Sequence, residues 1–185
     1  MKAIGILGSP RLRGNSTILT ERILDYGRTK GAAVERFMLS TMQVRGCQGC
    51  GACKNGLEDC AVSDDGATVL AAMREADVLV LASPIYFGEI TGQLKCFFDR
   101  TYSLLNPDFT SRLTPGRKAV YVLTQGDPDL SHYTDVFERY RTWTRSYGFG
   151  QDWVIRGESL GASGDVLNRT DLLAKADEIA KAVFG

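Results

Sequence analysis

Residues 77–84 read DVLVLASP, an apolar run without the polar–apolar alternation of a half-exposed strand. A continuous run of this kind is typical of a strand that is buried on both faces of a parallel sheet. Four more runs of strand length occur along the chain, at residues 2–8, 32–39, 118–126 and 152–160. Stretches with helical periodicity follow the strands, at residues 18–31, 68–76, 92–105, 129–148 and 166–185.

This alternation of strands and helices predicts the fold class. It is the pattern of βαβ units, in which helices cover a parallel sheet. We therefore expect an α/β, flavodoxin-like sheet of five parallel strands in the order 2-1-3-4-5, with helices on both faces. The sequence shows no internal repeat and no linker, so we expect a single domain over residues 1–185. The longest irregular segments, residues 40–66 and 106–117, are candidates for function.

The charge balance argues against several classes of partner. The chain has 185 residues, with 22 Lys and Arg against 22 Asp and Glu, so its formal net charge is zero. The sequence has no excess of basic residues that would favour binding to nucleic acid or to an anionic membrane surface.

No apolar run reaches the roughly 18 residues of a transmembrane helix. The first apolar stretch is short, so we expect no secretory signal and a cytoplasmic location, where thiols stay reduced.

The loop after the first strand is a candidate phosphate site. It reads GSPRLRGNST over residues 8–17 and leads directly into a helix, whose free N–H groups favour an anion. Polar donors surround Gly14, which we expect to take an unusual backbone turn. The predicted phosphate-binding residues are Ser9, Arg11, Arg13, Gly14, Asn15, Ser16 and Thr17. The alternative is that Asn15 and Ser16 only cap the helix.

Two common nucleotide motifs are absent. A P-loop has four residues between its glycines and then Lys, whereas five residues separate Gly8 from Gly14 and Asn15 follows. The dinucleotide fingerprint G-x-G-x-x-G is also missing. We therefore expect neither a nucleoside triphosphate nor a tightly held nicotinamide dinucleotide.

The run that ends the third strand can bind a flat ring. It reads Ser-Pro-Ile-Tyr-Phe-Gly over residues 83–88, with two adjacent aromatic side chains and then glycine. Aromatic faces and edges pack well against a planar heteroaromatic ring. Together with a phosphate loop, this run indicates a mononucleotide with a flat ring, namely FMN, held by Pro84, Ile85, Tyr86, Phe87 and Gly88. The alternative is a hydrophobic turn buried under the next helix.

Four cysteines lie within fourteen consecutive positions, with the spacing C-x2-C-x2-C-x6-C: Cys47, Cys50, Cys53 and Cys60. Such a cluster in a reducing compartment favours a metal site over a disulfide framework. The first two intervals are those of bacterial ferredoxins, and the longer third interval allows Cys60 to return to the same [4Fe–4S] cluster. A four-cysteine zinc site is the alternative. The fifth cysteine, Cys96, is expected in the core or an interface.

Three stretches, GSPRLRGNST, SPIYFG and GQLKCFFDR, resemble the NADPH-dependent FMN reductase branch of flavodoxin-like proteins. With the cysteine segment included, the chain is most similar to the iron–sulfur flavoproteins over residues 1–105. The resemblance implies that Ser9, Arg11, Asn15, Ser16 and Thr17 hold the FMN phosphate and that residues 84–88 hold its ring. It implies a third flavin-facing loop at Thr124, Gln125 and Gly126, and a homodimer or homotetramer with flavin near the interface.

Three functions follow as hypotheses. The first is an electron-transfer flavoprotein with FMN and a [4Fe–4S] cluster, which passes electrons between a ferredoxin-like carrier and a small acceptor. The second is an NAD(P)H-dependent FMN, quinone or nitro-compound reductase, whose cysteines bind zinc or no metal. The third is a redox or metal sensor. No side chain is predicted to be catalytic: His132 has no carboxylate placed beside it by sequence, and Asp64 and Asp65 are expected to cap the following helix.

Overall fold

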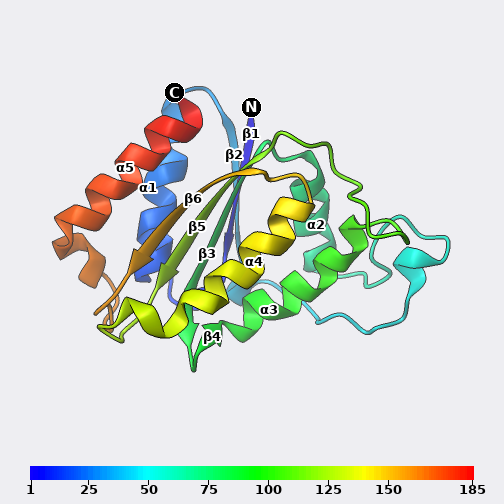
Figure 1. Ribbon diagram of the computed structural model, residues 1–185, viewed down its shortest axis with the longest axis horizontal. Helices are drawn as coiled ribbons and strands as arrows, with labels where there is room; N and C mark the ends of the chain where they lie inside the picture. The colour runs from blue at the N-terminus through cyan, green and yellow to red at the C-terminus, as the bar shows by residue number, and fades with distance from the viewer.

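Five parallel strands form the sheet of the computed structural model, which describes residues 1–185, in the order β2-β1-β3-β5-β6 (Figure 1). They are β1 (Lys2–Leu7), β2 (Ala33–Met38), β3 (Val78–Tyr86), β5 (Lys118–Thr124) and β6 (Gln151–Gly157). This order of parallel strands is the predicted one. The sequence did not predict the two-residue strand β4 (Glu89–Ile90), which pairs antiparallel with the end of β3.

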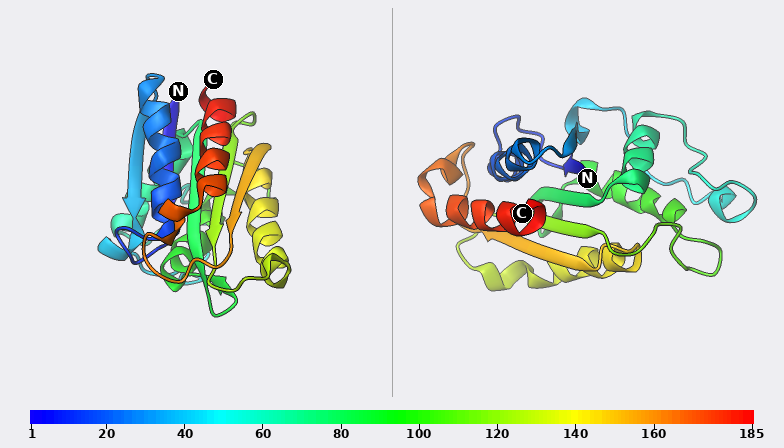
Figure 2. Two further views of the ribbon diagram at one scale, coloured as in Figure 1. Left: turned by 90° about the vertical axis from the view of Figure 1, so that its left-hand side faces the viewer. Right: turned by 90° about the horizontal axis from the view of Figure 1, so that it is seen from above.

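Helices cover both faces of the sheet (Figures 1 and 2). Two lie on one face, α1 (Asn15–Thr29) and α5 (Thr170–Phe184), and three lie on the other, α2 (Asp65–Glu75), α3 (Gly92–Phe98) and α4 (Thr134–Ser146). The strand β3 contributes to both cores: Val78, Val80 and Ala82 join the core under α1 and α5, and Leu79 and Leu81 join the other. Alternate side chains of a strand face opposite ways, which explains the continuous apolar run.

Several helix ends differ from the predicted ones. The helix α1 begins at Asn15, three residues before the predicted start, because the apolar periodicity sets in only after its first turn. The predicted helix 92–105 is α3 followed by a tighter 3-10 segment, Asp99–Leu104. The predicted helix 129–148 likewise starts with a 3-10 turn, Leu130–Tyr133, before α4. A periodicity of 3.6 does not distinguish these short 3-10 segments from an α-helix.

The cysteine segment projects from the sheet beside α2 and α3, coloured cyan at the right of Figure 1. It contains one short 3-10 turn, Ala52–Lys54, and is otherwise irregular. The second irregular segment lies beside it, since the Arg112 guanidinium donates a 2.9 Å hydrogen bond to the Cys53 carbonyl. No helix in the structure has both the length and the apolar character needed to cross a bilayer.

Candidate functional site

A cavity of about 190 Å³ opens at the carboxyl ends of β1, β3 and β5. The N-terminus of α1 lies on its wall, and the first N–H group of α1 with a carbonyl partner is that of Ile18, which bonds Gly14. The N–H groups of Asn15, Ser16 and Thr17 are therefore free, as at any helix start, and favour an anion. Ligands of open α/β sheets bind at this edge.

Eleven of the fifteen predicted flavin-binding residues line this cavity: Ser9, Arg11, Gly14, Asn15, Ser16, Pro84, Ile85, Tyr86, Thr124, Gln125 and Gly126. The structure thus brings the three predicted loops together. Four predicted residues are not on its wall. Arg13 and Thr17 face a separate surface depression beside α1, and Phe87 and Gly88 form the tip of the β3–β4 hairpin.

Gly14 does not take the unusual turn that the sequence analysis expects. Its φ of −65° and ψ of 154° are ordinary extended values. Glycine is needed here because of close packing, since a Cβ atom would lie 2.5 Å from the Ser9 hydroxyl. The predicted turn is therefore wrong, and the reason for glycine at this position is the tight approach of the loop to the start of its own helix.

Asn15 joins two loops that lie far apart in the sequence. Its amide N–H groups donate to the Leu160 and Ala162 carbonyls at 3.3 and 2.8 Å, and its oxygen accepts from the Val166 N–H at 3.1 Å. The N-cap of α1 is Gly14, with no side-chain cap bond, so Asn15 is not the capping residue of the alternative interpretation. Its side chain is already satisfied, which leaves its backbone N–H as the group available to an anion.

The loop after β6 contributes two wall residues that sequence reasoning missed, Leu160 and Gly161. The Arg11 guanidinium donates to the Gly161 carbonyl at 2.9 Å, which fixes this loop against the first one. The sequence contains the signal that predicts a wall position for this loop: the loop follows a strand, and the carboxyl end of every parallel strand lies at the same edge of the sheet.

The hairpin after β3 places its two tip residues in the left-handed region. Phe87 and Gly88 have φ values of 52° and 84° and lie between the paired residues Tyr86 and Glu89. Two consecutive positive φ values are typical of a type I′ turn. The Phe87 ring is fully exposed, so the alternative of a buried hydrophobic turn is wrong for this side chain.

Buried hydroxyl groups join this hairpin to the first loop. The Thr91 hydroxyl donates to the Gly8 carbonyl at 2.8 Å and caps α3 by accepting from the Leu94 N–H at 3.4 Å. The Thr91 N–H in turn donates to the Ser83 hydroxyl at 3.0 Å. These bonds hold the first loop and the β3–β4 hairpin in a fixed relation.

His132 has acidic partners that the sequence analysis did not expect. Its Nδ1 lies 2.8 Å from an Asp127 oxygen and its Nε2 lies 3.4 Å from an Asp129 oxygen. The hydrogen bond to Asp127 raises the pKa of His132 above its ordinary value. The Gln125 side chain donates to the Asp127 and Asp129 carbonyls, so the segment that holds His132 also supports the loop at residues 124–126.

All four clustered cysteines line one cavity of about 330 Å³, together with residues of the segment after α3. None forms a disulfide, and Cys53 and Cys60 are partly buried. Gly49 and Gly51 have φ values of 61° and 69°, a conformation that glycine adopts without strain. No three His, Cys, Asp or Glu side chains converge on a point where a single metal ion could bind.

Cationic side chains hold the cysteine segment by its backbone. Arg74 donates to the Glu58 carbonyl at 2.8 Å, and Arg112 donates to the same carbonyl and to Cys53. The Lys54 ammonium donates to the Tyr102 carbonyl at 2.7 Å and lies 4.0 Å from the centre of the Tyr102 ring. Burial lowers the pKa of Lys54, although the nearby Cys53 opposes this. The cysteine segment is therefore anchored to α2, to the 3-10 segment Asp99–Leu104 and to the irregular segment at residues 106–117.

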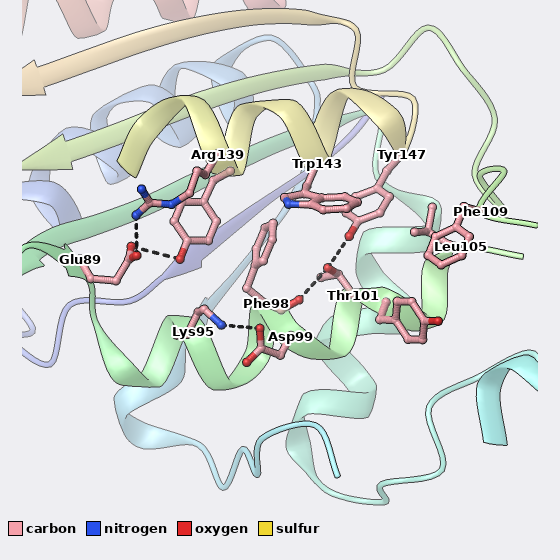
Figure 3. Close-up of a pocket in the computed structure, with 12 residues that line it drawn as sticks. Glu89, Lys95, Phe98, Asp99, Thr101, Leu105, Phe109, Arg139, Trp143 and Tyr147 are labelled. Atoms are coloured by element: carbon pink, nitrogen blue, oxygen red, sulfur yellow. Dashed lines mark hydrogen bonds and ion pairs between the residues drawn. The ribbon is translucent and has the colours of Figure 1, made fainter. Parts of the chain in front are cut away.

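A third cavity, of about 320 Å³, lies between α3 and α4 (Figure 3). Aromatic rings form much of its wall, and Trp143 and Phe109 are exposed at its rim. Charged pairs of both signs flank it: Lys95 bonds Asp99 at 2.6 Å, and Arg139 bonds Glu89 at 2.7 Å. Tyr102 lines both this cavity and the cysteine cavity, whereas no residue lines both the cysteine cavity and the one at the sheet edge.

The model of the NADPH-dependent FMN reductase family matches residues 1–129. The chain belongs to this family. The match spans the first loop, the cysteine segment and the β3–β4 hairpin, together with Thr124, Gln125 and Gly126. It confirms the predicted class of protein, the flavin-dependent oxidoreductases.

Curated relatives include iron–sulfur flavoproteins. One from Methanocaldococcus jannaschii is 40% identical over 104 residues, which are 56% of this chain and 53% of the relative. Another from Methanosarcina thermophila is 34% identical over 109 residues, which are 59% of this chain and 56% of the relative. The chain thus spans about half the length of these curated relatives.

Solved structures share the fold. An FMN-dependent NADH-azoreductase from Bacillus anthracis, determined in complex with FMN, aligns with a TM-score of 0.75. The alignment covers 100% of this chain and 99% of the azoreductase at 14% identity, so it supports the flavodoxin-like architecture alone.

Proposed function

We propose that this protein is an electron-transfer flavoprotein that binds FMN and a [4Fe–4S] cluster and passes electrons between a carrier such as ferredoxin and a small acceptor. One observation carries the proposal: the four cysteines line a single cavity in a chain that also has a nucleotide-type cavity at its sheet edge. The similarity to iron–sulfur flavoproteins supports the same pairing of sites.

The residues at the sheet edge fit FMN. The free N–H groups of Asn15, Ser16 and Thr17 suit the phosphate, and the Arg11 guanidinium and the Ser9 and Ser16 hydroxyls stand around them. Pro84, Ile85 and Tyr86 offer an apolar wall to the ring, beside residues 124–126 of the neighbouring strand end. The cavity is smaller than the 300–1,000 Å³ of pockets that enclose a whole ligand, so part of the ring would face the open surface.

The donor set of the cysteine cavity fits a cluster better than zinc. A zinc ion needs four sulfurs that converge on one point, whereas each iron of a [4Fe–4S] cluster takes a single thiolate. The cysteines share a cavity without converging, and they are not paired in disulfides. Cys47, Cys50, Cys53 and Cys60 would be the ligands.

When bound, FMN takes up electrons in pairs and can release them singly, whereas a cluster carries one at a time. The chain itself supplies position and electrostatics. The α1 N-terminus fixes the nucleotide by its phosphate, and Thr91 keeps the phosphate loop in register with the hairpin. Lys54, Arg74 and Arg112 hold the segment through backbone carbonyls, and their positive charges would offset part of the negative charge of four ligating thiolates.

Cysteine variants test this function. In the Cys47→Ser/Cys50→Ser/Cys53→Ser/Cys60→Ser protein, we expect FMN binding to persist and electron delivery from reduced ferredoxin to FMN to fall at least tenfold. Cys96→Ser is the matched control and should transfer electrons at the parental rate. Equal rates in the quadruple variant and the parent would reject the proposed path.

An NAD(P)H-dependent FMN, quinone or nitro-compound reductase is the second candidate. The description of the family that matches this chain favours NADPH as donor. Anaerobic mixing discriminates between the two: rapid bleaching of the flavin by NADPH in the absence of a carrier protein supports the second function. Bleaching only with reduced ferredoxin supports the first.

A further inference from the structure

Arg100 holds together the two ends of the cysteine segment, Arg45 on one side and Val62 and Asp64 on the other, which we call the neck of the segment. Its guanidinium bonds Asp64 at 2.5 Å and the Val62 carbonyl at 2.9 Å, both on the exit side of the segment. It also donates to the Arg45 carbonyl at 3.3 Å on the entry side. Arg100 is only 1% exposed, so this charge is enclosed by the two ends of the loop that carries the cysteines.

Gly66 shows how tightly this arrangement is packed. Gly66 lies in the first turn of α2, next to Asp64, and a Cβ atom there would collide with the Arg100 guanidinium. Asp64 is the N-cap of α2, as the sequence predicts, and accepts from the Gly66 N–H at 2.9 Å. One carboxylate thus caps the helix and pairs with the buried arginine.

Two buried donors beside the cysteines have no partner. The Arg100 Nε and the Ser103 hydroxyl are enclosed and make no hydrogen bond. Both residues line the cysteine cavity, and Ser103 is likewise only 1% exposed. Buried donors in folded proteins are nearly always satisfied, so two orphans on one cavity point to a missing acceptor.

Sulfur of a thiolate-bound cluster is a suitable acceptor. Cys60 lines the same cavity as Arg100 and Ser103, so its sulfur is close to both donors. N–H and O–H donors and positive charge near cluster sulfur stabilise the reduced, more negative state and raise the reduction potential. The third orphan, Arg74 Nε, belongs to a residue outside the cavity wall.

We propose that Arg100 and Ser103 are positioning and tuning residues of the cluster: Arg100 ties the neck of the cysteine segment, and both direct their free donors at cluster or Cys60 sulfur, which raises the reduction potential. The inference rests on the proposed function, because it requires a cluster on the four cysteines. It adds to that function two residues that no cysteine motif contains.

The test is a redox titration, monitored by electron paramagnetic resonance, of the protein reconstituted with iron and sulfide without oxygen. For Arg100→Gln we expect a potential lower by at least 59 mV, a tenfold change in the ratio of reduced to oxidised cluster at a fixed potential. Ser103→Ala should lower it by a smaller amount. Arg100→Lys, which keeps the charge, should recover part of the loss.

Arg117→Gln is the matched control. Arg117 also donates to several backbone carbonyls, those of Met73, Ala76 and Thr114, but lies off the cysteine cavity, so its loss should leave the potential unchanged. Parental potentials in folded Arg100→Gln and Ser103→Ala would overturn the inference. Should Arg100→Gln fail to fold, Ser103→Ala decides alone, because replacing a hydroxyl by hydrogen preserves the packing. Absence of any cluster in the parent would instead reject the proposed function.

Discussion

At the scale of single residues, Phe87 holds a backbone conformation that its side chain disfavours. Its φ of 52° lies at the first position of a turn that prefers Asn-Gly, and its ring gains nothing from burial. We expect Phe87→Asn to stabilise the protein by about 1 kcal/mol, because the left-handed conformation costs other residues roughly that amount. Urea unfolding measures the change.

Leu12→Asn is the control for this prediction. Leu12 is also an exposed apolar residue in a loop, but it has no positive φ, so its replacement should not stabilise the protein. A Phe87→Asn protein no more stable than the parent would contradict the assigned turn. Weaker FMN binding in a stabilised variant would indicate that the exposed ring contributes to the flavin site.

The pair of His132 and Asp127 gives a prediction about pH. The hydrogen bond between them raises the pKa of His132 from 6.5 and lowers the pKa of Asp127 from 3.8. The contribution of His132 to stability is fully present below pH 6.5 and is lost as pH rises through its raised pKa. The contribution of Asp127 is present above pH 3.8 and is lost as pH falls through its lowered pKa.

Nuclear magnetic resonance titration of the imidazole checks this pair. His132 is the only histidine, so its signals need no assignment by mutation. We expect a pKa above 6.5 in the parent and a lower one in Asp127→Asn. An unchanged pKa in that variant would show that Asp127 is not the main partner.

At the scale of elements, Asn15 joins the start of α1 to the loop after β6. The side chain is buried and makes three hydrogen bonds, so Asn15→Ala removes these bonds and leaves the Val166 N–H without a partner. We expect a loss of about 2–4 kcal/mol of stability, since each net bond contributes about 1 kcal/mol and a buried orphan costs more. Thermal and urea unfolding measure it.

Asn55→Ala is the control for the Asn15 prediction. Asn55 is exposed and makes one bond, to the Gly51 carbonyl, so its replacement should change the stability of the metal-free protein by less than about 0.5 kcal/mol. Equal effects of the two variants would show that the bonds between the loops contribute no more to stability than one exposed bond.

The sequence predicts the elements well where apolar periodicity is strong. The five parallel strands and their order follow from alternation and from general rules of α/β sheets, and three loops at one edge follow from that order. Loop detail was harder to predict, because it depends on contacts between distant segments. The role of Asn15 depends on its hydrogen bonds to the segment at residues 160–166. The acidic partner of His132, and the bonds by which Arg100 joins the two ends of the cysteine segment, also form only in the folded chain.

The same limits explain the four predicted flavin residues that lie outside the cavity wall. A loop motif specifies which residues are near the site but not which way each side chain points. Arg13 and Thr17 line a separate depression beside α1, and the hairpin turn directs Phe87 into solvent. The strand β4, which creates that turn, has only two residues and gives no periodic signal.

At the scale of the whole molecule, the predicted homodimer or homotetramer has a candidate interface. The cavity between α3 and α4 carries exposed aromatic rings at its rim, and its charged groups pair within the chain, so this face can meet a second copy without leaving a charge unpaired (Figure 3). We expect the parent to sediment as a dimer or tetramer and Trp143→Glu to sediment as a smaller species with an unchanged fold.

Leu167→Glu controls for the added charge. Leu167 is as exposed as Trp143 but lies beside α1, on the other side of the molecule, so its replacement should leave the assembly intact. Dissociation by both variants, or by neither, would place the interface elsewhere.

The proposed electron transfer requires two prosthetic groups bound to one chain. Quantification of FMN, iron and acid-labile sulfide in protein purified and reconstituted without oxygen tests this most directly. We predict one FMN, four iron and four sulfide per chain, and no iron in the variant that lacks Cys47, Cys50, Cys53 and Cys60. Bound FMN with no iron, or with one zinc ion on the four cysteines, would contradict the account.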